Sequence, residues 1–207
     1  RASVATRIVL PADKVDTSVY VPALMDLVGK VDGTTYMLPF YNYAMGLTYR
    51  TDLLADAKNQ AEFKAKYGMD LGVPKTWDEY LKQVEFFTKD GMHGVVNQGL
   101  RPDPIAMEWP NYLFANGAEY HDADWNPTFN NEAGVKAVEQ YATAINKYGP
   151  VGSASFSFDE AFNVMAQGKA YSYITYNFFR TAYDDPAKSA VVGKVEIMPV
   201  PGPTPET

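Results

Sequence analysis

Residues 32–56 read DGTTYMLPFYNYAMGLTYRTDLLAD, and the rest of the chain is organised around them. Residues 35–38 and 44–50 are two short runs of aromatic and apolar residues with high β-propensity. Between these runs Pro39 removes a backbone donor and fixes φ, so the chain must leave the sheet in an aromatic loop. The stretch therefore predicts a strand, a loop, a second strand and then a helix.

Length and composition are those of ordinary globular protein. The chain has 207 residues, 46% of them hydrophobic and 21% charged, which suffices for one domain or for a domain with pieces of another. The net charge of -7 argues against nucleic acid as a partner. The absence of cysteine excludes disulfides and thiol catalysis. The chain opens without a basic and then apolar leader, so we expect any signal peptide to be missing from it.

Helix and strand signals alternate through the middle of the chain. Residues 76–79 (TWDE) and 157–160 (SFDE) are capping boxes, in which a hydroxyl and a glutamate satisfy free amides of the first turn. The Asp-Pro pair at 103–104 opens another helix. The runs 94–97 and 170–176 are typical of buried strands. Together these signals predict an α/β fold.

Helical spacing also predicts which side chains face the core. In the helix that follows the first capping box, Trp77 lies on the apolar face, and we expect it to be buried. In a helix that starts after Asn130 or Asn131, the same spacing turns an apolar face inward, made of Val135, Val138, Tyr141, Ala142 and Ile145.

Several motifs, in this order, resemble the solute-binding proteins of bacterial ABC sugar importers. The first two are G-x-x-Y-x-L-P from Gly33 and G-L-x-Y-R-x-D-L-L from Gly46. They are followed by E-W-P-N-Y-L-F-A-N-G-A-E-Y from Glu108 and F-D-E-A-F-N-V-M-A-Q-G-K-A from Phe158. Each motif is loose, but their order and spacing extend the resemblance over residues 13–201.

The resemblance implies a domain organisation. The chain would be one lobe of a two-lobed periplasmic-binding-protein fold of type II, with a short mixed sheet flanked by helices. Residues 1–33 would be a remnant of the N-terminal lobe and linker, and residues 34–50 the strands that cross the hinge. Residues 51–200 would form the C-terminal α/β lobe, and residues 201–207 the proline-rich start of the return crossover.

The resemblance also implies a function. Such a protein binds a sugar, an oligosaccharide or a polyol in the cleft between its lobes and delivers it to the membrane subunits of an ABC permease. It makes and breaks no bond and needs no cofactor. The expected partners are the carbohydrate, the permease and the missing N-terminal lobe. The expected location is the periplasm, or the cell surface as a lipoprotein.

Hydrogen-bonding and aromatic side chains gather where predicted strands end, and α/β proteins often bind ligands at such ends. Asn97 and Arg101 lie at and just after the end of the strand 94–97, and Glu108 and Trp109 lie near the start of the next helix. Trp109 suits a core position as well as a flat face for a sugar ring. These four residues are candidate ligand-binding residues.

The resemblance adds four further candidates. In the family, the position after the strand equivalent to 170–176 commonly contributes cleft residues, which implies Tyr176 and Asn177 here. The loop between the first two strands faces the cleft in the family, which implies Tyr41 and Asn42.

An enzyme is the alternative function, together with a lectin-like module. The acidic pair 159–160 lies in the first turn of a helix, where capping explains it better than catalysis. Glu108 with Asp184 stays open as a glycosidase pair, since the sequence gives no separation between them. Arg180 could bind sugar hydroxyls or pair with Asp184 one turn further on.

Metal sites find little support in the sequence. His93 and His121 have no partner at ligand spacing, so we expect structural roles for both. Residues 122–126 begin like a calcium loop, but Pro127 stands where that loop needs glycine. We therefore expect a turn there, and no bound metal.

Overall fold

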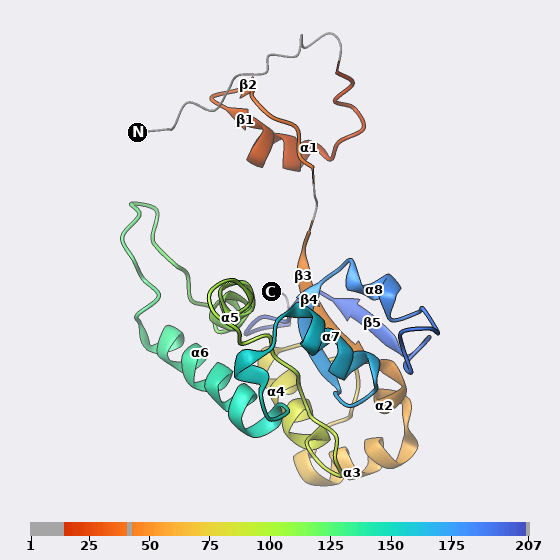
Figure 1. The fold of residues 1–207 in the computed structure, drawn as a ribbon. Coiled ribbons are helices and arrows are strands. Elements are labelled where there is room, and N and C mark those ends of the chain that lie inside the picture. The colour runs from red at the N-terminus through yellow and green to blue at the C-terminus, as the bar shows by residue number, and fades with distance from the viewer. Residues whose placement is uncertain (1–14, 41–42, 206–207) are drawn as a thin grey trace. The chain divides into compact units, whose positions relative to one another are not determined.

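The computed structural model describes residues 15–40 and 43–205 of the chain (Figure 1). These residues divide after Tyr43 into two compact units, each with its own internal contacts. The second unit, which starts at Ala44, holds most of the secondary structure.

The first unit is a short helical segment followed by a two-stranded ribbon. α1 (Pro22–Leu24) runs into η2 (Met25–Gly29), and β1 (Lys30–Val31) then pairs antiparallel with β2 (Thr34–Thr35). Residues 32–33 between the strands both have positive φ, as a tight two-residue hairpin turn requires.

The strand expected at 35–38 is wrong beyond Thr35, where β2 ends. The reason is that β1, its partner, is short and follows η2 directly. The amides of Tyr36 and Met37 turn instead to the carbonyl oxygen of Gly29 at the end of η2, at 2.8 and 3.3 Å. Local β-propensity cannot make a strand where no partner strand is in reach.

The second unit is built on a three-stranded antiparallel sheet. β3 (Met45–Arg50) lies in the middle, between β4 (Ser172–Tyr176) and β5 (Val195–Met198). All residues of β3 except the first are buried, as are the first four of β4. The sheet is therefore covered by helices on its faces.

Residues 93–97, called here the parallel segment, run beside β4 in the same direction. Single bridges join His93 to Ala170 and Val96 to Tyr173. The predicted strand thus pairs at two points, with Ala170 just before β4 and with Tyr173 in β4, and not along a continuous ladder. Its valines are fully buried, in agreement with a buried strand.

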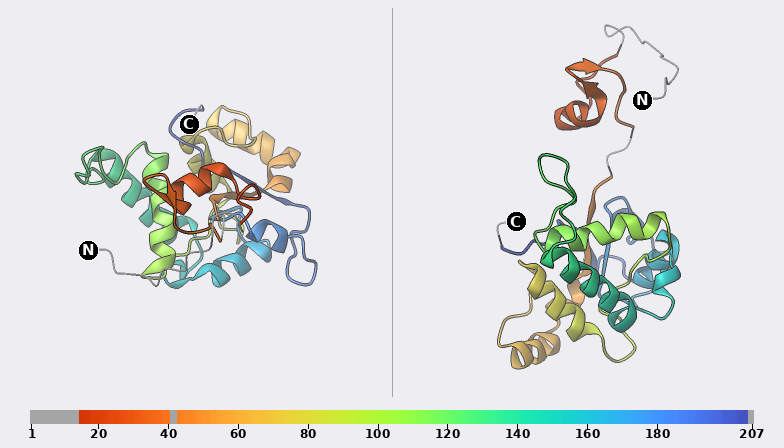
Figure 2. Two further views of the ribbon diagram at one scale, coloured as in Figure 1. Left: turned by 90° about the horizontal axis from the view of Figure 1, so that it is seen from above. Right: turned by 90° about the vertical axis from the view of Figure 1, so that its left-hand side faces the viewer.

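Helices α2 to α8 surround the sheet of the second unit, and Figure 2 shows them from two further sides. Their bounds are α2 (Thr51–Ala55), α3 (Ala57–Tyr67), α4 (Trp77–Phe87), α5 (Asp103–Ala115), α6 (Glu132–Thr143), α7 (Phe158–Ala166) and α8 (Phe179–Ala182). The short segments η3 (Ala144–Tyr148) and η4 (Ser153–Ser155) follow α6. Within the described residues, no helix combines the length and the apolar character that crossing a membrane requires.

Local caps explain where two of these helices begin. The hydroxyl of Thr76 accepts a hydrogen bond of 3.2 Å from the amide of Glu79, ahead of α4. Ser157 and Glu160 form a reciprocal capping box ahead of α7. Both predicted helix starts are confirmed, because each signal acts within a single turn.

The sheet separates two apolar cores. The larger core lies under α3 to α6, and the smaller core is formed with α7 and the chain that follows α8. Trp77 is 1% exposed in the larger core, with its ring centroid 4.9 Å from that of Tyr112 and nearly perpendicular to it. The predicted core position of Trp77 is confirmed.

The inward face predicted for α6 is only partly right. Tyr141 is buried, but Val135 and Val138 are exposed by 53% and 52%. The buried face of α6 carries Gly134 and Ala137 instead. Small residues let α6 lie close to its neighbours, so the closest packing and not the most apolar stripe decides the orientation of this helix.

Candidate functional site

Three strand ends meet at one edge of the sheet in the second unit. β4 and β5 run in the same direction, since both are antiparallel to β3, and the parallel segment runs with β4. Their carboxyl ends therefore lie together, where β3 begins. We call this the carboxyl edge, and it carries Asn97, Tyr176 and Asn177. Edges of this kind are where open α/β sheets usually bind ligands.

Helix α5 flanks the carboxyl edge. The side-chain nitrogen of Asn111 lies 3.5 Å from the sulfur of Met45, the first residue of β3, and Met45 pairs with Tyr176 at the end of β4. Asn111 also donates to the carbonyl oxygens of Met107 and Glu108, at 3.1 and 3.0 Å. Sequence reasoning missed Asn111. Its spacing of three residues from Glu108 on one helix is the signal that could have found it.

Tyr176 and Asn177 close the end of β4. The ring of Tyr176 lies 5.7 Å from that of Phe178, nearly parallel to it, and 5.8 Å from that of Phe158. Burial raises the pKa of the Tyr176 hydroxyl, which is therefore neutral at pH 7. The amide of Asn177 donates to the carbonyl oxygen of Ala44 at 2.9 Å, and its side chain is exposed. This aromatic cluster gives the edge flat apolar faces with polar rims.

Arg101 and Trp109 also keep surface in contact with solvent. Arg101 is exposed in the segment that leads from Asn97 to α5. Trp109 is half-buried on α5, where it packs against the larger core and its ring lies 6.3 Å from the ring of Tyr120. The packing of Trp109 agrees with a core position, and its exposed part leaves the ligand-facing position a prediction.

Asn97 and Glu108 lie inside the second unit, and both are 0% exposed. The side-chain amide of Asn97 donates to Glu108 at 2.9 Å and to the hydroxyl of Tyr112 at 3.2 Å. Their burial gives no support to a direct ligand contact. Tyr41 and Asn42, the candidates from the opening loop, lie outside the described residues.

The alternative pairs of charged residues fall into structural roles. Arg180 forms an ion pair with Asp184 and a second one, of 3.2 Å, with Glu196. The pairing considered for Arg180 is thus confirmed. Glu108 has no exposed surface while Asp184 has, so a substrate cannot reach both carboxyl groups of the glycosidase pair.

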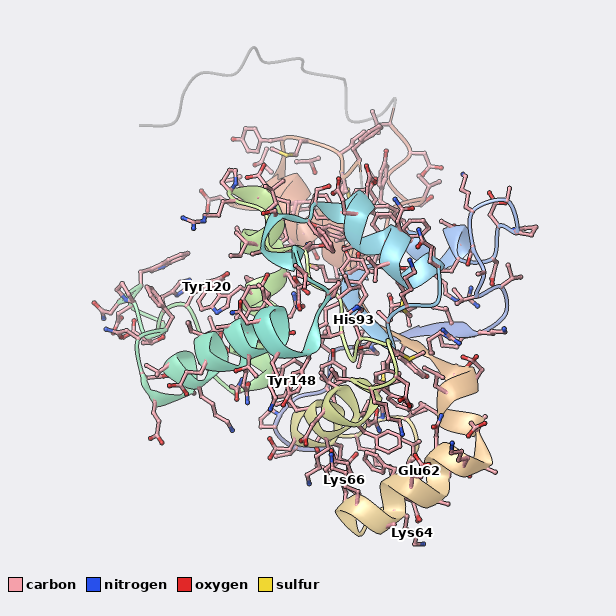
Figure 3. All side chains as sticks on the ribbon, turned by 60° about the horizontal axis from the view of Figure 1, so that its bottom comes forward. Glu62, Lys64, Lys66, His93, Tyr120 and Tyr148 are labelled. Atoms are coloured by element: carbon pink, nitrogen blue, oxygen red, sulfur yellow. The ribbon has the colours of Figure 1, made fainter. Side chains whose placement is uncertain are left out.

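The contacts of the two histidines and of the turn at residues 122–126 are also structural. Burial lowers the pKa of His93 (Figure 3), so its ring is mainly neutral at pH 7. The ring of His121 stacks on Trp125 at 4.3 Å. The carboxylate of Asp122 accepts from the amides of Asp124 and Asn126, both at 2.9 Å, which confirms the expected turn. Among the described residues, no three metal-ligating side chains form a group.

Two curated proteins are similar to most of this chain. One is described as a probable amino-acid ABC transporter periplasmic-binding protein, y4oP, from Sinorhizobium fredii, 27% identical over 161 residues. The other is the mannitol-binding protein of Pseudomonas aeruginosa, 27% identical over 164 residues. The matches cover 77% and 78% of this chain but only 37% and 35% of these relatives.

Solved structures share the fold. A solute-binding protein from Agrobacterium radiobacter K84, in complex with ribitol, matches with a TM-score of 0.73 and 27% identity, over 88% of this chain and 44% of its own. Maltose-bound MalE3 of T. maritima matches with a TM-score of 0.71 and 24% identity, over 89% of this chain and 45% of its own. The α/β fold expected from the sequence is therefore that of one lobe of a periplasmic-binding protein. The family model for bacterial extracellular solute-binding proteins matches residues 3–207, and the chain belongs to this family.

Proposed function

We propose that this chain is part of the solute-binding component of an ABC importer, which takes up a sugar, an oligosaccharide or a polyol in the periplasm and delivers it to the permease. The observation that carries the proposal is the carboxyl edge with its exposed Tyr176 and Asn177, flanked by α5 with the half-buried Trp109, in a chain of this family. The relatives named for mannitol and ribitol support the same class of ligand.

The charges of the exposed candidate residues favour a neutral ligand with many hydroxyl groups. Of the candidates in the described residues, Arg101, Trp109, Tyr176 and Asn177 keep exposed surface, and they bring one cation and no acid. An amino acid needs a partner for its ammonium group as well as for its carboxylate. Glu108, the acid among the candidates, is enclosed. A polyol or sugar therefore fits this edge better than the amino acid named for the y4oP relative.

The first unit fits the expected link to another lobe. Val19, Leu27 and Met37 are exposed by 75%, 78% and 59%, which is a large apolar surface for so few residues. We infer that an N-terminal lobe of the same protein covers it, and that residues 34–50, which contain β2 and β3, cross the hinge.

Transport by such a protein depends on shape and not on chemistry. A ligand held by both lobes stabilises the closed arrangement, because each lobe contributes contacts only when the cleft is shut. The permease then distinguishes the closed, loaded receptor from the open one. No bond in the ligand is formed or broken.

The experiment is calorimetric titration of the full-length protein with four probes: ribitol, D-mannitol, maltose and L-alanine. We expect heat of binding from a polyol or the sugar and none from the amino acid. After overnight incubation, maltose should be recovered intact. Binding of alanine alone would contradict the ligand class, and release of glucose from maltose would favour the alternative of a glycan-active enzyme.

A further inference from the structure

A buried carboxyl group lies directly behind the carboxyl edge. Glu108, on α5, accepts hydrogen bonds from the side chain of Asn97 at 2.9 Å, from the backbone amide of Gln98 at 2.8 Å and from the hydroxyl of Tyr141 on α6 at 3.0 Å. The side chain is 0% exposed. One carboxyl group thus joins the end of the parallel segment to two helices.

The surroundings of Glu108 contain phenols but no cation. The titratable groups that face it are Tyr80 on α4, Tyr112 on α5, Tyr141 on α6 and Tyr173 on β4. Burial raises the pKa of each phenol, so all four are neutral at pH 7. Within the described residues Glu108 has no ion-pair partner. Burial raises the pKa of its carboxyl group to about 8, although the three hydrogen bonds act in the opposite direction.

The amide of Asn97 can serve a protonated carboxyl group as well as an ionised one. Its nitrogen now contacts both Glu108 and the hydroxyl of Tyr112, while its oxygen is buried without a partner among the described residues. Turning this amide by half a rotation exchanges the two atoms. Its oxygen then accepts from the protonated Glu108 and from Tyr112. A protonated Glu108 can therefore donate its O–H to the oxygen of Asn97.

The network fixes the segment that leads to the ligand candidates. The second carboxyl oxygen of Glu108 holds the amide of Gln98, and the side chain of Gln98 donates to the carbonyl oxygen of Pro104 at 3.1 Å. Arg101 lies between these two anchors, and Trp109 is the next residue after Glu108. Ionisation of Glu108 would therefore affect both the segment that carries Arg101 and the adjacent residue Trp109.

We propose that Glu108 is a positioning residue that acts in its neutral form, and that loss of its proton loosens residues 98–102 and weakens ligand binding at the carboxyl edge. The second part rests on the proposed carbohydrate-binding function. Ionisation leaves a charge without a counterion in the core, and water or a rearranged segment must then compensate for it. Glu108→Gln keeps the shape of the neutral acid, with the two N–H donors of an amide in place of one O–H, but it cannot ionise.

The test follows amide resonances of the full-length protein by NMR from about pH 6 to about pH 10. In the wild type, the Gln98 amide should shift with a midpoint near pH 8, and in Glu108→Gln this transition should be missing. The amide of Gly193 is the internal control. It donates to the exposed carboxylate of Asp184 at 3.0 Å, whose pKa is held low by that bond and by Arg180, so it should not titrate in this range.

A second variant keeps the test decisive if Glu108→Gln folds poorly. Tyr141→Phe removes one donor to the ionised form of Glu108, so the midpoint should rise, by up to about one pH unit. A Gln98 amide that does not titrate in the wild type, or a midpoint that falls in Tyr141→Phe, would overturn the role of Glu108.

The binding arm uses ribitol, D-mannitol and maltose. If ionisation of Glu108 costs the complex about the free energy of one hydrogen bond, the wild type should bind its ligand about tenfold more weakly at pH 9 than at pH 7. Glu108→Gln should show no such change. The same pH dependence in both proteins would refute the coupling. Failure of all three probes at pH 7 would refute the proposed function instead, since the NMR arm does not need a ligand.

Discussion

Gly94→Ala should destabilise the fold far more than its single added methyl group implies. A Cβ at residue 94 would lie 1.8 Å from the carbonyl oxygen of Val84 and 2.6 Å from the hydroxyl oxygen of Thr88. Neither atom is free to move aside. Thr88 donates to that same carbonyl at 2.7 Å and accepts from the amide of Gly94 at 3.1 Å. The contact therefore joins the backbone of the parallel segment to the backbone of α4.

The size of the effect follows from this geometry. Ordinary contact begins near 3.4 Å, so the parallel segment and α4 must separate by about 1.6 Å to accept the new atom. Overpacking of this kind costs typically 1–3 kcal/mol, and backbone on both sides places Gly94→Ala at about 3 kcal/mol or more. For a domain of this size, about 1 kcal/mol lowers Tm by roughly 2–4 °C. A fall in Tm of roughly 6–12 °C is therefore expected.

Thermal unfolding monitored by circular dichroism measures this fall, with Gly72→Ala as the matched control. A Cβ at Gly72 meets nothing within 4 Å, and this residue does not have positive φ. The same chemical change there should leave Tm unchanged or raise it slightly, because alanine restricts the unfolded chain. Equal Tm values for the two variants would refute the packing argument for the parallel segment.

Three further predictions concern the core, the pH dependence and the carboxyl edge. Trp77→Ala should cost about 3–5 kcal/mol in urea unfolding, whereas Trp125→Ala, at a residue 77% exposed, should cost less than about 0.5 kcal/mol; equal losses would contradict the core assignment. Between about pH 4.5 and pH 8, the wild type should lose about 1.4 kcal/mol of stability per pH unit relative to Glu108→Gln, because the unfolded chain releases the Glu108 proton first. Parallel stability curves for the two proteins would disprove that linkage. Tyr176→Ala in the full-length protein should weaken sugar binding about tenfold at nearly unchanged Tm, and Trp125→Ala should not; the reverse pattern would move the site elsewhere.

Features encoded within one helical turn could be predicted from the sequence. The capping boxes at 76–79 and 157–160 place the starts of α4 and α7 correctly, because the hydroxyl and the amide it satisfies are three residues apart. Features that depend on a distant partner could not. The strand expected at 35–38 stops at Thr35 because β1 offers no further pairing. The face of α6 follows close packing through Gly134 and Ala137, which an apolar stripe does not reveal.

The candidate site divides in the same way. Strand ends and polar residues near them pointed to the region of the carboxyl edge, which depends on topology alone. Whether each side chain faces solvent depends on contacts between distant residues. Glu108 is enclosed because Tyr141, 33 residues further on, donates to it from another helix. The residues near Glu108 in the sequence do not indicate that Tyr141 is its partner.

We propose that this chain supplies one lobe of a receptor that holds its ligand between two lobes. A receptor of micromolar affinity has about 8 kcal/mol of binding free energy, and keeping half of it would give a dissociation constant near 1 mM. The direct measurement is calorimetric titration of the 207-residue chain beside the full-length protein, with whichever of ribitol, D-mannitol and maltose the latter binds most tightly. We predict affinity at least about a thousandfold weaker for the 207-residue chain. Equal affinities would mean that the whole site lies in this chain, and would contradict the two-lobed account.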